Sequence, residues 1–247
     1  LPNEWDPSLA DKNIGVTAGI ETDVCNPEWI NCVNKMDAVI VPSTHSKKCF
    51  ENTSPDITTP ISVIPESFDP AYLESHTHLP LNLNTEFNFL MIGQLTAQSP
   101  DEDRKNTFYG IKWFCEQFKD REDVGLIVKT NRGRNTTLDF RIVSNMFEKL
   151  ISEVRDGEYP KVHFLHGNLT TSQMNSLYRH SSIKALLAPT KGEGYGLPLL
   201  EASACGLPVM ATNFSGHLDF LITLTVLLPN KISFAPVAPV VPMTIIS

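Results

Sequence analysis

Two parts of the chain alternate short apolar runs with amphipathic segments. In the first part, apolar runs predict strands at 13–20, 38–41 and 61–65, and amphipathic segments predict helices at 26–36 and 43–51. We expect Asn26 and Ser43 to be the N-caps of these helices, because both are polar residues placed just before a helical pattern. The run at 38–41 is apolar at every position, which is typical of a buried parallel strand.

A second series follows a polar, proline-bearing linker at 70–85. It predicts strands at 87–92, 124–128, 161–165, 183–188 and 208–211, and helices at 107–119, 137–154, 170–179 and from Leu197 to Gly206. Regular alternation of strand and helix is the pattern of parallel sheets covered by helices. The fold class predicted is therefore α/β, with two doubly wound parallel-sheet domains of which the N-terminal one is incomplete.

The composition changes sharply near the end of the chain. Residues 221–247 contain a single charged side chain, Lys231, and four prolines. We predict three parts: a first domain with its linker at 1–83, a second domain at 84–221, and an atypical apolar tail at 222–247. Both ends look cut, so we expect a fragment whose tail is out of register with related proteins, for example through a shifted reading frame; an apolar tail docked on the fold is the alternative.

The charge and the cysteines narrow the class of protein. A net charge of −8 argues against a general nucleic-acid-binding surface. The five cysteines are scattered without a C-x-x-C pair, which predicts free thiols in a reducing compartment. Prolines interrupt the apolar tail, so no membrane-spanning helix is expected. We expect a cytoplasmic protein, and leave peripheral association with a membrane open.

The segment Gly192–Glu201 reads as a glycine-rich loop that leads into a helix. Gly192, Gly194 and Gly196 allow tight turns and close approach of a ligand, and Pro198 suits the start of a helix. The amide groups at such a helix start attract anions. Glu201 lies in an apolar run, where a carboxylate is costly to bury unless it accepts hydrogen bonds. The segment therefore predicts a ligand with an anionic part and with hydroxyl groups beside Glu201.

Basic residues follow two other predicted strands of the second series. Arg104 and Lys105 follow the first strand, and Lys129 ends the second. In a doubly wound sheet, ligands bind at the carboxyl ends of the strands, so Arg104 and Lys129 are expected to converge with the Leu197 helix on an anion such as a diphosphate. Solvation of the charged loop 101–105 is an equally good explanation of Arg104 and Lys105 from spacing alone.

The two glutamates, Glu193 and Glu201, have seven residues between them in a G-E-G-Y-G-L-P frame. This segment resembles the nucleotide-sugar site of retaining glycosyltransferases of the GT-B fold, most like family 4, the glycosyl transferases group 1. The resemblance covers about 14–221 and implies two Rossmann-like domains, an acceptor-side domain at 1–83, of which only the C-terminal portion is present, and a donor-binding domain at 84–221. It implies that Arg104, Lys105 and Lys129 bind the donor diphosphate, Glu193 positions the donor sugar and Glu201 binds the ribose.

The resemblance extends to other parts of the donor site. It places the H-G-x-L element near the nucleobase and the loop that precedes the helix near the donor; the residues concerned are His166, Gly167, Asn168, Leu169, Gly194, Tyr195, Gly196 and Leu197. Asp219 stands where an acidic residue, usually Glu, is common. Many relatives have a histidine where this chain has Glu21. Glu21 is expected either to face the cleft and contact acceptor or sugar, or to be a surface turn residue.

The activity implied is transfer of a sugar from a nucleotide diphosphate sugar to a glycan, lipid or other acceptor, with retention and without a metal or another cofactor. Glu193, Arg104, Lys129 and Glu21 are the candidate catalytic residues. We interpret the triplet 101–103 as a solvated acidic turn and not as a metal site. The alternatives are a non-catalytic nucleotide-sugar-binding module, or a UDP-sugar epimerase of the same fold. As a fragment, the chain alone is not expected to be a competent catalyst.

Overall fold

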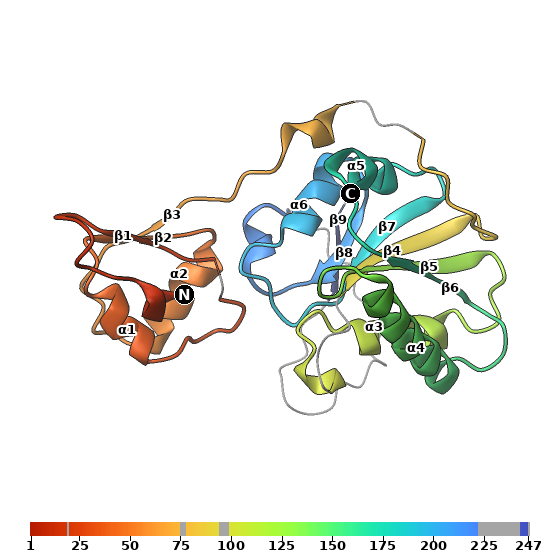
Figure 1. Cartoon of the computed structure of the whole chain (residues 1–247), viewed down its shortest axis with the longest axis horizontal. Helices are drawn as coiled ribbons and strands as arrows, with labels where there is room; N and C mark the ends of the chain where they lie inside the picture. The colour runs from red at the N-terminus through yellow and green to blue at the C-terminus, as the bar shows by residue number, and fades with distance from the viewer. Residues whose placement is uncertain (19, 75–77, 94–98, 222–242, 247) are drawn as a thin grey trace. The chain divides into compact units, whose positions relative to one another are not determined.

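The computed structural model describes residues 1–18, 20–74, 78–93, 99–221 and 243–246. Its chain forms two compact units that are interleaved in sequence (Figure 1). Unit 1 consists of Leu1–Phe68, Gly192–Leu200 and Phe214–Ile222, and unit 2 of Asp69–Lys191, Glu201–Asn213 and Thr223–Ser247. The domain boundaries expected from sequence, after residues 83 and 221, stay predictions.

Unit 1 is built on a small parallel sheet. Its strands are β1 (Ile14–Val16), β2 (Ala38–Val41) and β3 (Ile61–Val63), and its helices are η1 (Pro2–Glu4), α1 (Glu28–Val33), α2 (Thr44–Thr53) and η4 (Gly216–Asp219). The strands lie in the order β1-β2-β3, with β2 parallel to both neighbours. Buried side chains such as Val33, Val39 and Phe50 form a core between the sheet and the two α-helices.

The two predicted helix starts in unit 1 have different outcomes. Ser43 is the N-cap of α2, as predicted, and its hydroxyl accepts a hydrogen bond from the Ser46 amide. Asn26 is not the N-cap of α1, because that helix begins one residue later, after Pro27. The Asn26 side chain instead accepts from the Glu28 amide, so it still stabilises the turn that leads into the helix. The strand predicted to reach residue 20 ends at Val16.

Unit 2 contains the larger sheet. Its strands are β4 (Phe87–Gly93), β5 (Val124–Thr130), β6 (Lys161–His166), β7 (Ile183–Ala188), β8 (Val209–Thr212) and β9 (Met243–Ile246). Its helices are η2 (Pro70–Leu73), η3 (Pro100–Glu102), α3 (Thr107–Gln117), α4 (Thr137–Val154), α5 (Thr171–Tyr178) and the second half of α6 (Leu197–Ala204).

The strand order in unit 2 is β6-β5-β4-β7-β8-β9. The chain builds outward from β4 in one direction through β5 and β6, and then returns to the other side of β4 with β7 and β8. The order therefore reverses between β4 and β7, and such a switch point is where doubly wound sheets bind ligands. All neighbouring strands are parallel except β9, which runs antiparallel to β8.

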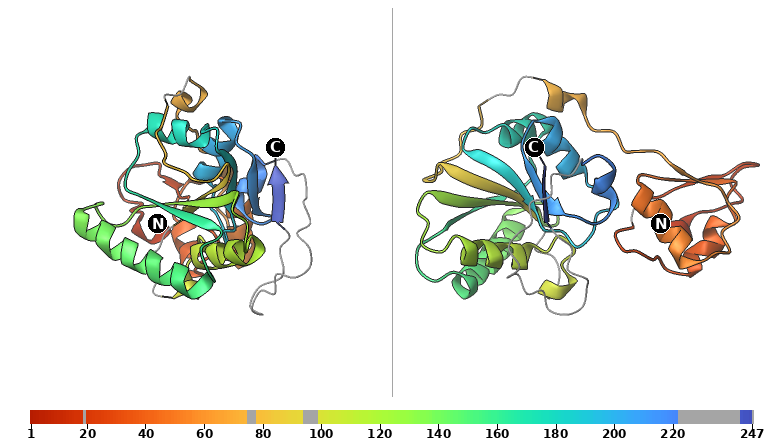
Figure 2. Two further views of the ribbon diagram at one scale, coloured as in Figure 1. Left: turned by 90° about the vertical axis from the view of Figure 1, so that its right-hand side faces the viewer. Right: turned by 180° about the vertical axis from the view of Figure 1, so that it is seen from behind.

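Helices cover both faces of the larger sheet. Alternate residues of its central strands, among them Phe89, Leu126 and Val128, form a core with α3 and α4 on one face. Leu90 and Ile127, which point to the other face, are also fully buried, and α5 lies there in Figures 1 and 2. Every residue of β5 is buried, as expected for a parallel strand covered on both sides.

The predicted α/β class with two parallel sheets is confirmed. The bounds predicted for α4 and β7 agree with the structure, and α3 ends two residues earlier than expected. Most of the predicted tail, residues 222–242 and 247, lies outside the described residues, and 243–246 form β9. Among the described residues, no helix combines the length and the apolar character needed to cross a bilayer.

Candidate functional site

The loops after β4 and β7 meet at the switch point of the larger sheet. The carbonyl oxygen of Arg104 accepts hydrogen bonds from the Lys191 amide at 2.9 Å and from the Thr190 hydroxyl at 3.2 Å. The Thr212 hydroxyl, at the end of β8, donates to the Thr190 carbonyl. These bonds fix the backbone that carries Arg104 and Lys105 at the carboxyl edge of the sheet. Both side chains are partly exposed there.

Asp103, next to Arg104, corrects one prediction. It is 7% exposed, so the acidic turn 101–103 is not solvated throughout. Its carboxylate accepts from the amides of Lys105 and Thr107, at 3.0 and 2.6 Å, at the start of α3. A carboxylate in this position satisfies amides that have no partner within the helix. Asp103 therefore shapes the loop that carries Arg104. Among the described residues, no cluster of potential metal ligands was found.

Lys129 is the second-to-last residue of β5 and is only 5% exposed. Its Nζ donates to Oδ1 of Asn131 at 2.6 Å, and Nδ2 of Asn131 donates to Oδ1 of Asn168 at 3.0 Å. Burial lowers the pKa of Lys129 below its ordinary value of 10.5. The three side chains connect the carboxyl ends of β5 and β6 and present a positive charge and amide groups at this edge.

The predicted H-G-x-L element begins at the last residue of β6. Gly167 has a φ of 110° and its amide donates to the Thr130 carbonyl, so the chain turns sharply out of the sheet. The His166 ring packs against Phe140 and Phe164. Burial, and then the charge of Lys129, lower the pKa of His166. Its Nε2 is buried and has no hydrogen-bond partner in the described part of the chain. The ring is therefore a neutral, partly apolar surface at neutral pH.

Glu201 accepts hydrogen bonds, as its position in an apolar run predicts. The Tyr178 hydroxyl donates to Oε2 of Glu201 at 3.0 Å, and the Tyr72 hydroxyl also faces the carboxylate. Burial raises the pKa of Glu201 above its ordinary value, and the two hydroxyl groups oppose that shift. The hydroxyls beside Glu201 are thus contributed in part by the protein itself.

The glycine-rich loop belongs to unit 1 and is held by hydrogen bonds to other parts of that unit. The amide and carbonyl of Glu193 bond to the Ser215 hydroxyl and the Gly216 amide, at 2.8 and 2.9 Å, and the Ser43 hydroxyl donates to the Gly194 carbonyl at 2.6 Å. Glu193 is 5% exposed. The donor residues predicted on this loop, Gly194, Tyr195, Gly196 and Leu197, are therefore carried by a fixed backbone.

The glycines of this loop were predicted to allow close approach of a ligand. At Gly192 and Gly194 the structure places protein backbone there instead. A Cβ atom at Gly192 would overlap the Glu21 carbonyl, and one at Gly194 would overlap the Ala18 carbonyl. Gly196 has a φ of 101° and leads into α6, in which Pro198 is the second residue and not the first.

Two further predicted residues lie in unit 1. Glu21 is half-buried and lies beside Gly192, next to the loop that carries Glu193. The Asp219 carboxylate accepts from the Thr44 amide at 2.6 Å, at the start of α2. His45, one residue further along α2, packs edge-on against Phe214. Burial lowers the pKa of His45, while the backbone of Thr22 and Glu21 opposes the shift.

The structure thus gathers the predicted residues in two groups. Unit 2 carries those expected to bind diphosphate, base and ribose: Arg104, Lys105, Lys129, His166, Gly167, Asn168, Leu169 and Glu201. Unit 1 carries Glu21 and Glu193. Sequence reasoning missed Asn131, Tyr72 and Tyr178. Asn131 follows Lys129 by two positions at a strand end, a signal that was available, whereas the tyrosines lie in short helical segments far from Glu201 in sequence.

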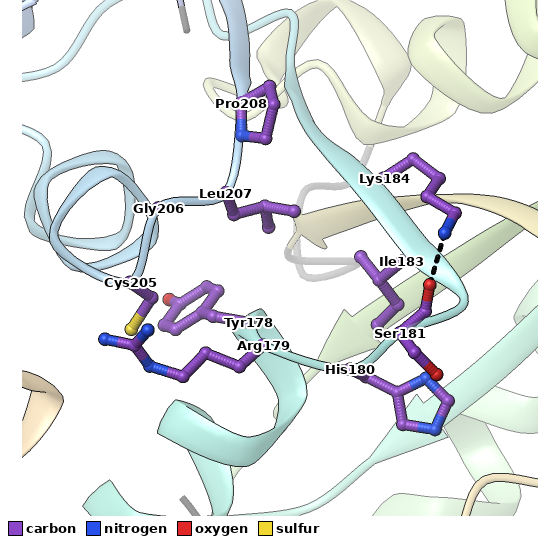
Figure 3. A pocket seen from close by; sticks show the side chains of 10 residues that line it. All are labelled: Tyr178, Arg179, His180, Ser181, Ile183, Lys184, Cys205, Gly206, Leu207 and Pro208. Atoms are coloured by element: carbon purple, nitrogen blue, oxygen red, sulfur yellow. Dashed lines mark hydrogen bonds between the residues drawn. The ribbon is translucent and has the colours of Figure 1, made fainter. Parts of the chain in front are cut away.

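The cavity drawn in Figure 3 lies at the opposite edge of the sheet. Its volume is about 440 Å³, and its walls include Arg179, Ile183, Lys184, Cys205 and Pro208. Ile183 begins β7 and Pro208 precedes β8, so the cavity is at the amino ends of these strands. Doubly wound sheets bind their ligands at the carboxyl ends. The cavity is therefore separate from the residues that sequence analysis selected.

Known proteins resemble the chain in sequence and in fold. The family Glycosyl transferases group 1 matches residues 127–231. Sucrose synthase from Solanum tuberosum is 30% identical over 131 residues, which are 49% of this chain and 15% of the relative. Sucrose synthase isoform 1 from Daucus carota is 27% identical over 129 residues, 48% of this chain and 15% of that protein. The chain thus spans a small part of the curated relatives.

Solved structures extend the similarity over more of the chain. A trehalose-6-phosphate protein from E. coli, bound with UDP-2-fluoro glucose, has a TM-score of 0.58 at 12% identity and covers 86% of this chain and 61% of that one. An α,α-trehalose 6-phosphate synthase from Burkholderia multivorans has a TM-score of 0.58 at 10% identity. The similarity covers 78% of this chain and 49% of that one. At these identities the similarity establishes the fold. The chain therefore has part of a GT-B fold, and its residues 127–231 are similar to the glycosyl transferases of group 1.

Proposed function

We propose that this chain carries the donor site of a glycosyltransferase that moves a sugar from a nucleoside diphosphate sugar to an acceptor. The observation that carries the proposal is the cluster of Lys129, Asn131 and Asn168 at the carboxyl edge of a doubly wound sheet. The buried lysine lies within the segment that matches the group 1 family. A similar fold holds UDP-2-fluoro glucose in the E. coli trehalose-6-phosphate protein, which supports a nucleotide-sugar ligand.

The diphosphate is the part of the donor that suits the positive groups. Lys129 is a buried ammonium group whose hydrogen-bond partner, the Asn131 amide oxygen, is uncharged. A buried charge with a neutral partner is only partly compensated, so an anion beside it gains more than it would in water. Arg104 and Lys105 add positive charge from the loop at the switch point. Charge that builds on the leaving diphosphate during transfer would be stabilised by these groups.

The base and ribose are assigned to the remaining residues of unit 2. The segment His166–Leu169 offers backbone groups and the neutral His166 ring to the nucleobase. Glu201 accepts hydroxyl hydrogen bonds, and the tyrosines beside it leave part of its acceptor capacity unused. A ribose with two hydroxyl groups suits this carboxylate.

The sugar and the acceptor are assigned to the residues of unit 1. Glu193, on its fixed loop, would position the donor sugar, and Glu21 would contact the sugar or the acceptor. We propose transfer with retention, as described for a structurally similar trehalose-6-phosphate synthase with a TM-score of 0.57. We further propose that transfer uses no metal, because the donor-binding set is cationic and can neutralise the diphosphate itself. The acceptor class, glycan or lipid, is left open.

Calorimetric titration of the chain with UDP and with GDP tests the donor site. We expect saturable binding of one nucleotide, and a loss of about tenfold or more in Arg104→Ala and Lys129→Met, since bonds to charged groups are worth ~1.5–3 kcal/mol each. Arg121→Ala is the matched control, because it removes an exposed positive charge that pairs with Asp123 at the amino end of β5. Equal binding by wild type and both site variants would reject the proposal.

A further inference from the structure

The Glu201 carboxylate is held by two tyrosines that come from separate parts of unit 2. Tyr178 is the last residue of α5 and is 1% exposed, and its hydroxyl lies 3.0 Å from Oε2 of Glu201. Tyr72 belongs to η2 and is 5% exposed, and its hydroxyl faces the same carboxylate and opposes the rise in its pKa. The two rings lie 6.0 Å apart. An ionised carboxylate has roughly four acceptor positions, so about two or three remain for a ligand.

The backbone that carries Tyr72 is itself fastened to unit 2. Nδ2 of Asn175 donates to the carbonyls of Ala71 and Glu74, at 2.9 and 3.3 Å. Nη2 of Arg179 donates to the Tyr72 carbonyl at 2.9 Å, and Nε of Arg179 donates to Oδ1 of Asn175 at 2.8 Å. Figure 3 shows Arg179 reaching toward Cys205 beside Tyr178. The segment Asp69–Glu74 is thereby held against α5 by Asn175 of that helix and by Arg179, which follows it.

The two tyrosines restrict the orientation of the Glu201 carboxylate more than is needed to compensate for its burial. The Tyr178 hydroxyl compensates part of the burial cost of Glu201, and the Tyr72 hydroxyl beside the carboxylate also restricts its rotation. Both tyrosine side chains are rigid rings that rotate about two side-chain bonds only. A carboxylate held in this way loses less conformational entropy when a ligand binds.

We propose that Tyr72 and Tyr178 are positioning residues, which hold the Glu201 carboxylate so that its remaining acceptor sites receive the ribose hydroxyl groups of the nucleotide. The inference rests on the proposed function, because it needs a nucleotide beside Glu201. It adds that the segment 69–74, which follows β3 and precedes the larger sheet in the chain, is part of the donor site through Tyr72.

The test compares a nucleotide with its analogue that lacks the ribose hydroxyl groups. Whichever of UDP and GDP the chain binds more tightly is titrated, together with its 2′,3′-dideoxy form. In the wild type we expect the ribose form to bind about tenfold more tightly. In Tyr72→Phe and in Tyr178→Phe the preference should fall to about twofold, while affinity for the dideoxy form stays within about twofold of the wild type.

The control removes the same kind of bond elsewhere. The Tyr109 hydroxyl donates to the exposed Asp101 carboxylate at 3.0 Å, so Tyr109→Phe deletes one tyrosine–carboxylate bond without touching Glu201. It should keep the wild-type preference. Glu201→Gln should reduce the preference at least as much as the two tyrosine variants.

The outcomes separate this inference from the proposed function. If the tyrosine variants weaken both nucleotide forms equally, their role is structural and the inference is wrong. The same holds if the wild type binds both forms equally, although the diphosphate site would then stand. If the wild type binds neither UDP nor GDP, the proposed function fails and the inference fails with it. If one tyrosine variant does not fold, the other gives the answer.

Discussion

The Nζ atom of Lys129 lies 2.6 Å from Oδ1 of Asn131, and this pair stands at the carboxyl end of a strand that is buried along its whole length. The amide oxygen is neutral, so it offsets only part of the cost of burying an ammonium group. A protein that keeps such a charge gives up some stability. The gain is a desolvated positive group ready for an anion, which is how we interpret the site.

Replacing Lys129 with Met should separate stability from binding. Met has a similar length and no charge, so we expect the melting temperature to stay the same or to rise, because replacing a buried charge by an apolar side chain is often neutral or stabilising. Affinity for the nucleoside diphosphate should fall by about tenfold or more. Thermal unfolding and calorimetry check the two parts. A variant that is less stable yet binds normally would show that Lys129 has a structural role.

The same substitution should change the titration of His166. Burial is the larger cause of the lowered His166 pKa, and the charge of Lys129 is the second. Lys129→Met should therefore raise the pKa of His166 but leave it below the ordinary value of 6.5. The pH dependence of the imidazole carbon-bound proton signals in NMR measures this directly. An unchanged pKa of His166 would show that the two side chains are too far apart to interact.

Glu201 should give the stability of the chain a defined pH dependence. Burial raises its pKa above 4.5, so the folded chain binds this proton more tightly than the unfolded chain. The free energy of unfolding contributed by Glu201 therefore falls as the pH rises from 4.5 through the higher folded-state pKa, and is constant above it. Asp69 adds to the shift, whereas Tyr72 and Tyr178, which face the same carboxylate, stay neutral over this range.

Urea unfolding at a series of pH values, with Glu201→Gln as the comparison, isolates this contribution. The difference in unfolding free energy between wild type and variant should shift against the wild type as the pH rises. A difference that moves in the wild type's favour would mean that the tyrosine hydroxyls outweigh burial, and that the pKa of Glu201 is lowered.

Gly194→Ala should be strongly destabilising. A Cβ atom at this position would overlap the Ala18 carbonyl, so one of two backbone segments must move. We expect a loss of ~2 kcal/mol or more, as for overpacked cores. Gly157→Ala is the control, since Gly157 has a φ of 78° and no atom within 4 Å of the added carbon. That change should cost about 1 kcal/mol from backbone strain alone. Similar losses in both variants would argue against close packing of the loop.

Asp103→Ala should cost about 1–2 kcal/mol of stability, as for the loss of a helix cap. Its carboxylate accepts from two amides at the start of α3, whereas the exposed carboxylate of Asp101 accepts only from Tyr109 among the bonds described for that side chain. Asp101→Ala should therefore have a much smaller effect. Chelation by EDTA should leave nucleotide affinity unchanged in the wild type. If nucleotide affinity depends on added Mg²⁺ and is lost in Asp103→Ala, the triplet 101–103 is a metal site after all.

Local signals in the sequence predicted most of the fold. The apolar run of β2 and the amphipathic repeat of α4 identified elements whose bounds depend on residues close in sequence. The end of β1 was not predicted, because a strand ends where its neighbour stops pairing, and apolar residues such as Ile20 continue beyond that point. The capping role of Asp103 was missed because it also depends on tertiary structure. Whether a charged residue is buried depends on the packing of the whole loop that contains it.

The site was predicted in part. Strand ends are visible in sequence, so Lys129 and the H-G-x-L element could be placed at one edge of the sheet. The partners of Glu201 could not, since Tyr72 and Tyr178 lie more than 20 residues from it in sequence. The glycines were assigned to a ligand, yet two of them accommodate the backbone carbonyls of Ala18 and Glu21. A sequence shows where backbone must approach something closely, but not what it approaches.

A crystal structure of the chain soaked with UDP and GDP tests the central claim most directly. The account predicts one nucleotide at the carboxyl edge of the larger sheet, with a phosphate oxygen within hydrogen-bonding distance, about 2.7–3.2 Å, of Lys129 Nζ. The base should lie beside His166–Gly167 and the ribose beside Glu201. A nucleotide bound instead in the cavity of Figure 3, or density at neither place at saturating concentration, would contradict it.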